Sequence, residues 1–229
     1  MGDIHGRDDL LQELHDSIVD FHQLQFNSTD ATIVYLGDYI DGGMQSIQVI
    51  DRLISGVKGF KTICLLGNHE EMMLNCIDSN DPVVWKLWLS NGGQTTLDNL
   101  GITSRVDEFD CERLRTTLGE KRVTWLRSLP LFKIAKPYLF VHAGIKPGIP
   151  IHEQDRHDLL WIRGRFLDSN LDHGFQVVHG HTPSDDPIVK SNRICIDVGA
   201  TSNGVLIAAV LDCHTKPLFL RSIGEPIKV

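Results

Sequence analysis

The stretch Gly-Asp-Tyr-Ile-Asp-Gly-Gly at residues 37–43 decides how this chain is interpreted. It follows a short apolar run at 32–36, which predicts a β-strand, and it precedes a helical pattern at 45–53. A strand that ends in glycine and carboxylates places negative charge at the carboxyl edge of a sheet, where open α/β folds bind their ligands. We therefore expect Asp38 to bridge two metal ions and the rest of the chain to be arranged around it.

The composition is that of a globular protein and excludes several functions. Of the 229 residues, 41% are hydrophobic and 23% are charged, which is typical of a chain with a sizeable core. The net charge of -8 argues against binding to nucleic acid, which needs a basic face. Five cysteines without a Cys-x-x-Cys pair indicate neither a disulfide framework nor a thiolate zinc site. Because no segment resembles a membrane span or a signal peptide, we expect a cytoplasmic protein that binds no membrane.

Strand and helix patterns alternate along the chain, which indicates an α/β fold. Apolar spacing predicts a helix at 8–24 and a strand at 61–66, and later strands at 138–141, 175–178, 193–196, 205–211 and 218–220. Between 81 and 129 we expect a helical insertion with helices at 109–118 and 123–129, and at 158–166 a loop-rich segment. No linker interrupts the sequence, so residues 1–229 are interpreted as a single domain.

Ligand-type side chains stand at the predicted strand ends, each within two residues of a glycine. Taken singly, each is ordinary turn chemistry or a structural histidine. Together they predict convergence, because parallel strands share a carboxyl edge. The candidates offer only oxygen and imidazole nitrogen, which suits Mn, Fe or Zn: Asp3, His5, Asp38, Asn68, His142 and His181. Two divalent ions would leave this site positive, so that it attracts phosphate and makes hydroxide available near neutral pH.

Five motifs together resemble one known family. They are Gly-Asp-Ile-His-Gly at 2–6, Gly-Asp-Tyr-Ile-Asp at 37–41, Gly-Asn-His-Glu at 67–70, His-Ala-Gly at 142–144 and Gly-His-Thr at 180–182. From residue 2 to about 200 the chain resembles the calcineurin-like metallophosphoesterases. Within them it is most similar to the phosphoprotein phosphatase branch in its small bacterial and phage Ser/Thr phosphatase form, to which symmetrical diadenosine tetraphosphatases are related.

The resemblance implies a four-layer sandwich of two mixed β-sheets flanked by helices, with a dinuclear centre at one end. It implies that Asp3 and His5 hold the first metal, most simply Mn²⁺, and that Asp38 bridges. Asn68, His142 and His181 would complete the second metal site. His69 matches the general acid of the family, and Asp41 matches its partner. We expect Asn68 and His69 to lie in an extended turn, so that one faces the metal and the other the leaving group.

Two features depart from the family pattern. Gly42 stands where the family has an arginine that grips phosphate, so we expect Arg163 or Arg7, with Asn68, to bind the substrate. Restoring the arginine by Gly42→Arg is expected to lower KM or raise kcat. The family also has a first strand that would lie upstream of Met1, so the fold is expected to be truncated there and to gain from an apolar N-terminal extension.

Three functions remain open from the sequence. The first is a phosphoserine/phosphothreonine phosphatase in which a metal-bridging hydroxide attacks phosphorus in line, with Asn-Gly-Gly at 91–93 and the helix before it shaping the substrate approach. The second is a symmetrical diadenosine tetraphosphate hydrolase, which needs a base-stacking pocket. Trp88, Trp161 or Phe166 could line one, although packing in the core is the commoner use of each. The third is a catalytically impaired binding protein that keeps the metal ligands.

Overall fold

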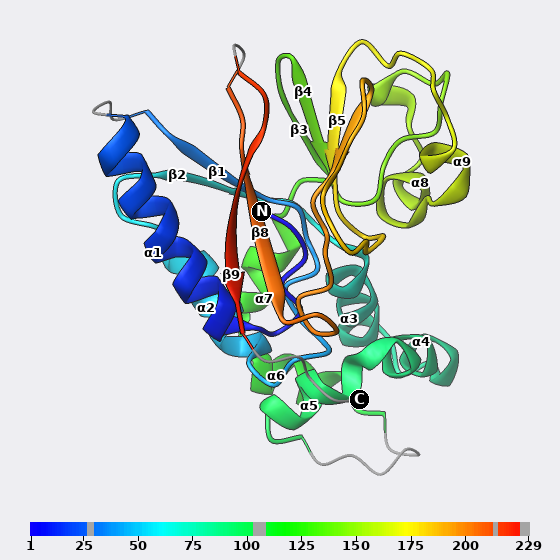
Figure 1. Cartoon of the computed structure of the whole chain (residues 1–229). Coiled ribbons are helices and arrows are strands. Elements are labelled where there is room, and N and C mark those ends of the chain that lie inside the picture. Colours follow the sequence, from blue (N-terminus) through cyan, green and yellow to red (C-terminus); the bar gives the residue numbers. More distant parts are fainter. Residues whose placement is uncertain (27–29, 103–108, 213–214, 225–229) are drawn as a thin grey trace.

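Two layers of β-strands lie at the centre of the molecule, with helices outside them (Figure 1). The structure is a computed structural model that describes residues 1–26, 30–102, 109–212 and 215–224. The arrangement confirms the predicted α/β fold with mixed sheets. None of the described helices is long and apolar enough to cross a membrane.

The first layer consists of two strand pairs joined by the start of the chain. The pairs are β1 (Thr32–Tyr35) with β2 (Lys61–Cys64), which are parallel, and β8 (Val205–Val210) with β9 (Leu218–Ile223), which are antiparallel. The amine of Met1 donates to Val34 O at 2.7 Å, and Leu36 N–H donates back to Met1 O. On the other side Gly2 N–H donates to Ile207 O at 3.0 Å. The N-terminus therefore lies between β1 and β8, as Figure 1 shows.

The second layer is a five-stranded mixed sheet in the order β3-β4-β5-β7-β6. Its strands are β3 (Phe132–Ala135), β4 (Tyr138–Val141), β5 (Gln176–His179), β6 (Ile188–Val189) and β7 (Arg193–Cys195). The three central strands run parallel, and the outer two are antiparallel to their neighbours. Leu36 and Leu65 from the first layer pack against Val178 and Ile194 from the second, which joins the two layers in one apolar cluster.

Within the described residues, seven α-helices pack on the side of the first layer. They are α1 (Asp8–Gln25), α2 (Ser46–Ser55), α3 (Asn68–Asp78), α4 (Pro82–Trp88), α5 (Gln94–Asn99), α6 (Cys111–Leu118) and α7 (Glu120–Arg127). Helix α1 buries Leu10, Leu11 and Leu14 at the predicted spacing. The described residues between 81 and 127 are mainly helical, as predicted, and α4 joins α5 through a kinked turn, Leu89–Gly93.

Two segments differ from the prediction. Residues 158–166, expected to be loop-rich, contain most of the short helices α8 (Arg156–Trp161) and α9 (Gly164–Leu167), which are too brief to show a helical period. The carboxylate of Asp155 caps α8 by accepting the His157 N–H. Asn68 and His69, expected in an extended turn, are instead the first residues of α3. Strands β3 and β6 were not predicted.

A groove of about 320 Å³ continues from Met1 between β1 and β8. We call it the strand groove; Ile33, Val34, Ala209 and Val210 form its sides. Helix α1 covers one face through Ile18 and Phe21, and the second sheet covers the other through Phe140 and Val178. The groove therefore has the position, the apolar lining and the two covered faces that a central strand of the first layer would require.

Candidate metal centre

The candidate ligands lie on loops that leave the strands of both layers at one end. Asp38 follows β1, Asn68 follows β2, His142 follows β4 and His181 follows β5. Among the described residues other than glycine, the four with left-handed backbone φ are His5, Asp38, Asp41 and His181. Such φ values are strained for side chains with a Cβ and cluster at functional sites. The strained backbone thus coincides with the predicted site.

The first two loops hold each other by backbone hydrogen bonds. Asp38 O accepts from the N–H groups of Ile4 and His5, each at 2.9 Å, and Gly6 N–H donates to Tyr39 O at 2.8 Å. These bonds fix the loop that carries Asp3 and His5 against the loop that carries Asp38. The convergence that the sequence predicted is therefore present between loops far apart in the chain.

Glu70 fixes the Asp38 loop from the other side. Its carboxylate is fully buried and accepts four backbone N–H groups, from Gly67, Asp38, Tyr39 and Ile40, at 2.7–3.3 Å. Burial, and then the nearby charge of Asp38, raise the pKa of Glu70 to about 8. The sequence motif at 67–70 included Glu70, but no role was predicted for it.

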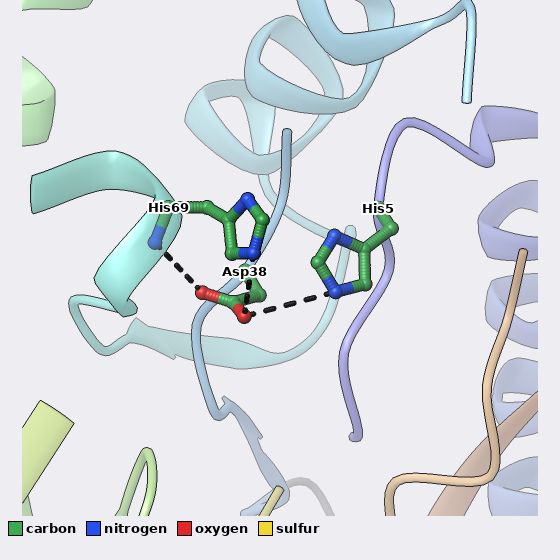
Figure 2. A group of neighbouring side chains, drawn as sticks. All are labelled: His5, Asp38 and His69. Carbon is green, nitrogen blue, oxygen red and sulfur yellow. Dashed lines mark hydrogen bonds and ion pairs between the residues drawn. The ribbon is translucent and has the colours of Figure 1, made fainter. Parts of the chain in front are cut away.

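Asp38 is shared by two groups of side chains that could each hold a cation: His5, Asp38 and His69, and Asp38, His142 and His181. Its Oδ2 lies 3.7 Å from His5 Nε2 and 3.8 Å from His69 Nε2 (Figure 2). Its Oδ1 lies 3.4 Å from His142 Nε2. Burial acts to raise the pKa of Asp38, but the surrounding imidazoles, His142 first, outweigh it and hold the pKa below its usual range.

The imidazoles are oriented so that their lone pairs meet. His142 Nδ1 lies 2.9 Å from Leu36 O and His5 Nδ1 lies 3.0 Å from Ile40 O. A carbonyl oxygen only accepts, so these Nδ1 atoms carry the proton and each Nε2 presents a lone pair. His142 Nε2 faces the carbonyl oxygen of Asn68 at 2.8 Å and His181 Nδ1 at 3.2 Å. Acceptors gathered this closely fit a cation between them.

Asp3 adds a free acceptor to the site. Its Oδ2 accepts the His181 N–H at 2.8 Å, while its Oδ1 is buried without a hydrogen-bond partner. Burial, followed by the charges of Asp197 and Asp38, raises the pKa of Asp3 well above its ordinary value. A buried carboxylate facing other carboxylates is stabilised by a cation, so the donor set fits divalent metals.

His69 and Asp41 form a pair beside Asp38. His69 Nδ1 lies 2.8 Å from Asp41 Oδ2, and Asp41 is fully buried. Burial acts to lower the pKa of His69, but the charge of Asp38 and the hydrogen bond that His69 donates to Asp41 outweigh it and raise the pKa to about 9. The ring therefore keeps a proton available at Nε2.

A cavity of about 210 Å³ opens in front of this centre. Its described lining includes His5, Asp38, Asn68 and His69 from the centre, and Asn91, Trp161, Arg163, Asp197, Thr201 and Ser202 around them. Carboxylates, an amide and imidazoles converge here beside a proton donor and a guanidinium. These are the groups that metal-assisted hydrolysis of a phosphoester requires.

A family model for the calcineurin-like phosphoesterases matches residues 1–207. The chain is a calcineurin-like phosphoesterase. The resemblance predicted from the five motifs is thereby confirmed, and with it a metal-dependent phosphoester hydrolase.

Two known relatives cover most of the phosphoesterase. Serine/threonine-protein phosphatase 2 of Escherichia coli is 35% identical over 215 residues, which are 90% of this chain and 88% of that protein. The asymmetrical bis(5'-nucleosyl)-tetraphosphatase PrpE of Anoxybacillus flavithermus is 24% identical over 228 residues, which are 91% of this chain and 87% of that one.

Solved structures share the fold of the phosphoesterase at low identity. One, of a protein named as a candidate diadenosine tetraphosphatase, has a TM-score of 0.65 at 19% identity and covers 98% of this chain and 92% of its own. Another, a protein serine/threonine phosphatase from Saccharomyces cerevisiae, has a TM-score of 0.54 at 13% identity and covers 99% of this chain and 79% of its own. They support the predicted α/β sandwich.

The two arginines predicted to bind phosphate lie in different surroundings. Arg163 is exposed and lines the cavity, with Nη1 at 3.4 Å from Thr182 Oγ1. Arg7 is buried, and its guanidinium donates to both carboxylate oxygens of Asp9 and to Ala200 O. These contacts hold the start of α1 against the loop at Ala200, so we assign Arg7 a structural role in the phosphoesterase and keep Arg163 as the candidate phosphate ligand.

Sequence reasoning missed Asp197, although a signal was present. Asp197 is buried, lines the cavity and follows β7 two residues before Gly199. This is the same pattern of a carboxylate near glycine after a strand that identified Asp38. Burial raises the pKa of Asp197. Its position next to Asp3 and His5 adds a negative charge to the side of the site that would hold the first metal.

The structure reverses the expected benefit of Gly42→Arg. Gly42 has φ +78°, and a Cβ there would lie 2.9 Å from the Thr201 methyl group. We now expect the variant to lose roughly 1–3 kcal/mol of stability through left-handed strain and to gain no activity. Thermal unfolding and steady-state kinetics would test this. A variant with unchanged Tm and a lower KM would show that the loop can accommodate the arginine.

Metal binding is expected to stabilise the phosphoesterase more in mildly alkaline than in mildly acidic buffer. Because its folded pKa is raised, Asp3 stabilises the metal-free protein at low pH, and this contribution is lost as pH rises through that pKa. A bound cation takes the place of the proton on Asp3. Burial lowers the pKa of His181 to about 3, so His181 is neutral in both buffers and does not contribute to the difference between them. A hundredfold excess of metal over Kd adds about 2.7 kcal/mol.

The measurement is the Tm with Mn²⁺ minus the Tm with chelator in each buffer. Asp3→Asn is the control, since it removes the titrating group and should flatten the difference. An equal metal effect in both buffers for the unmodified protein would contradict the assignment of Asp3.

Proposed function

We propose that this phosphoesterase is a two-metal phosphomonoesterase that acts on phosphoserine and phosphothreonine. The observation that carries the proposal is that Asp38 is shared by two groups that could each hold a cation, one of which includes His69, the residue paired with Asp41. The similarity to serine/threonine-protein phosphatase 2 of Escherichia coli over 90% of the chain supports the substrate class. The cavity of about 210 Å³ suits a phosphate and the side chain that carries it.

The residues divide into two metal sites that meet at Asp38. Asp3 and His5, with Asp38, would hold the first ion, and Asn68, His142 and His181, with Asp38, would hold the second. Oxygen and imidazole ligands without thiolate favour Mn²⁺, with Fe or Zn as alternatives. When bound, two such ions supply a Lewis-acidic centre that polarises phosphoryl oxygens and ionises water near neutral pH.

The remaining steps belong to side chains of the protein. Arg163 binds the phosphate from the open side of the cavity. His69 donates its Nε2 proton to the leaving oxygen as the bond from phosphorus to that oxygen breaks. Asp41 accepts the Nδ1 proton of His69 in a hydrogen bond, which keeps the ring turned toward the cavity and favours its protonated form.

Arg163→Ala is expected to raise KM for phosphomonoesters by about 10- to 140-fold, because one charge-assisted hydrogen bond contributes roughly 1.5–3 kcal/mol and each 1.4 kcal/mol is a factor of ten. Arg165→Ala is the matched control: Arg165 is equally exposed, two residues away, and is not among the described residues that line the cavity. Steady-state kinetics with p-nitrophenyl phosphate would measure both. Equal effects of the two substitutions would show that phosphate is bound elsewhere.

A second candidate function is hydrolysis of a dinucleoside tetraphosphate. The similarity to the tetraphosphatase of Anoxybacillus flavithermus over 91% of the chain favours it. Of the three aromatic residues that could line a stacking pocket, Trp88 and Phe166 are fully buried and pack in the core, the commoner use of such residues. Trp161 is partly exposed and lines the cavity, and it remains available for stacking. That relative is named asymmetrical, whereas the sequence led us to expect symmetrical cleavage.

A substrate panel with Mn²⁺ separates the candidates. A phosphothreonine peptide, diadenosine tetraphosphate and p-nitrophenyl phosphate are assayed side by side, with His69→Asn as a control. The proposal expects the peptide to have the highest kcat/KM. Preference for diadenosine tetraphosphate would favour the second candidate, and its products would separate ADP alone from ATP with AMP. Inactivity on all three with two metals bound would indicate a binding protein.

The proposal also includes the cellular compartment in which the enzyme acts. The structure describes four free cysteines, of which Cys76 and Cys195 are buried thiols. Free thiols persist in a reducing compartment such as the cytoplasm. We therefore propose a cytoplasmic enzyme.

A further inference from the structure

The carboxylate of Asp41 has a donor for each oxygen, and two of the three donors come from the helical segment α4–α5. Oδ2 accepts from His69 Nδ1 and from the indole Nε1 of Trp88, each at 2.8 Å. Oδ1 accepts from the Thr96 hydroxyl at 2.6 Å, and the same hydroxyl accepts the Asp41 N–H at 3.0 Å. Asp41, Trp88 and Thr96 are all fully buried. This arrangement leaves the carboxylate one orientation.

The Asn-Gly-Gly turn at 91–93 is what allows the segment to reach Asp41. Trp88 ends α4 and Thr96 lies on α5, with the turn between them. Gly92 has φ +95°, and a Cβ on Gly93 would lie 2.7 Å from the Trp88 indole. The turn thus brings Trp88 and Thr96 to the same carboxylate from two helices, a role different from the predicted shaping of the substrate approach.

We propose that Trp88 and Thr96 are positioning residues, which fix the carboxylate of Asp41 so that His69 Nε2 is directed at the leaving oxygen. The inference rests on the proposed function, because it needs His69 as the proton donor. When the bond from phosphorus to the leaving oxygen breaks, its electron pair stays on that oxygen and takes the Nε2 proton. The Nδ1 proton remains in the hydrogen bond to Asp41.

The consequence is a dependence on the leaving group. A leaving group that is stable as an anion needs no proton, so misorienting His69 costs little. An alkoxide or a poorly stabilised phenoxide needs the proton, so the same misorientation slows its release. Removing the indole N–H also leaves Asp41 Oδ2 with one donor in a buried site, and the carboxylate is then free to turn.

The experiment compares p-nitrophenyl phosphate with phenyl phosphate, two aryl esters of similar size whose leaving groups differ in acidity. Thr96→Val removes one donor at nearly unchanged volume. Trp88→Phe removes the indole N–H together with part of the ring, a loss of packing that a matched Trp85→Phe variant also carries. Each is expected to lower kcat on phenyl phosphate by about 10- to 100-fold, the range of a partial loss of general-acid catalysis. On p-nitrophenyl phosphate the expected loss is below about threefold, since that leaving group needs little proton transfer.

Two controls match these variants. Trp85→Phe removes an indole from the same helix, where Trp85 Nε1 donates to Ser79 O instead of to Asp41. Thr96→Ser keeps the hydroxyl. Both should leave the ratio of the two rates near that of the unmodified enzyme. Metal content and circular dichroism are recorded for every variant, and if Trp88→Phe fails to fold, the Thr96 pair carries the test.

The outcomes separate the inference from the proposed function. Equal losses on both substrates, or the same rate ratio for Trp88→Phe and Trp85→Phe, would show that Trp88 only packs, and the inference would be overturned. If His69→Asn itself leaves the phenyl phosphate rate intact, the proton-donor assignment fails and the inference fails with it. Leaving-group dependence in His69→Asn, Trp88→Phe and Thr96→Val together would support both.

Discussion

Asp38→Asn is expected to lower kcat by at least about 10³-fold, the largest effect expected of a single substitution in this enzyme. Metal-centred charge stabilisation contributes several kcal/mol, and each 1.36 kcal/mol is a factor of ten in rate. Asp38 is the member shared by both candidate cation groups, so its loss affects both sites. Asparagine tolerates the left-handed φ of +53° at this position, so the backbone should be retained.

The measurements are kcat with p-nitrophenyl phosphate and metal content by mass spectrometry of the dialysed protein. His69→Asn is the comparison, because His69 lies beside the same loop. This variant is expected to keep both metals bound and to retain most of the kcat on p-nitrophenyl phosphate. If Asp38→Asn retained two bound metals and its activity, Asp38 would not be the bridge. Each candidate cation group would then have to bind its metal without a shared ligand.

An apolar extension such as Val-Ile-Val before Met1 is expected to raise the free energy of unfolding by about 1.5–3 kcal/mol. Burial of its three aliphatic side chains contributes roughly 1.5–3 kcal/mol each, and ordering the three residues costs roughly 1–2 kcal/mol each. The strand groove of about 320 Å³ offers β1 and β8 as pairing partners and covers both faces of an added strand. Burial also lowers the pKa of the Met1 amine to about 5. An extension converts this amine into a peptide N–H that can still donate to Val34 O.

Urea denaturation of the two forms would measure the gain. A Gly-Ser-Gly extension of equal length is the control, because it supplies backbone donors and acceptors without apolar side chains. Equal stability of the apolar and polar extensions would show that the groove does not accept a strand. Activity should be unchanged in both, since the groove lies away from the metal centre.

The candidate site was predictable from the sequence because its ligands stand at strand ends within two residues of a glycine. Asp38, His142 and His181 could be identified from that pattern alone, and the structure brings them together. The roles of Asp41 and His69 came from the family resemblance and stay predictions, although the two side chains are in contact.

Other parts depended on tertiary contacts that no local pattern reports. The turn predicted at Asn68 is a helix start because Glu70 reaches back to the backbone of the Asp38 loop, about thirty residues earlier in the chain. The hydrogen bond from Trp88 to Asp41 spans 47 residues and follows from a kink whose direction two glycines permit. A buried tryptophan after an apolar helix is ordinarily interpreted as core, and the sequence contains no sign of its hydrogen-bond partner.

The two layers of the sandwich would contribute different ligands to one ion of the proposed centre. Asp38 and Asn68 follow strands of the first layer, whereas His142 and His181 follow strands of the second. A cation held by all four is therefore a crosslink between the sheets, comparable to a disulfide that can be removed by chelation. The free energy of metal binding would then add to the free energy that holds the two sheets together. The two sheets of the metal-loaded protein should then separate only when the metal leaves, so catalytic competence and the integrity of the sandwich are lost in the same event.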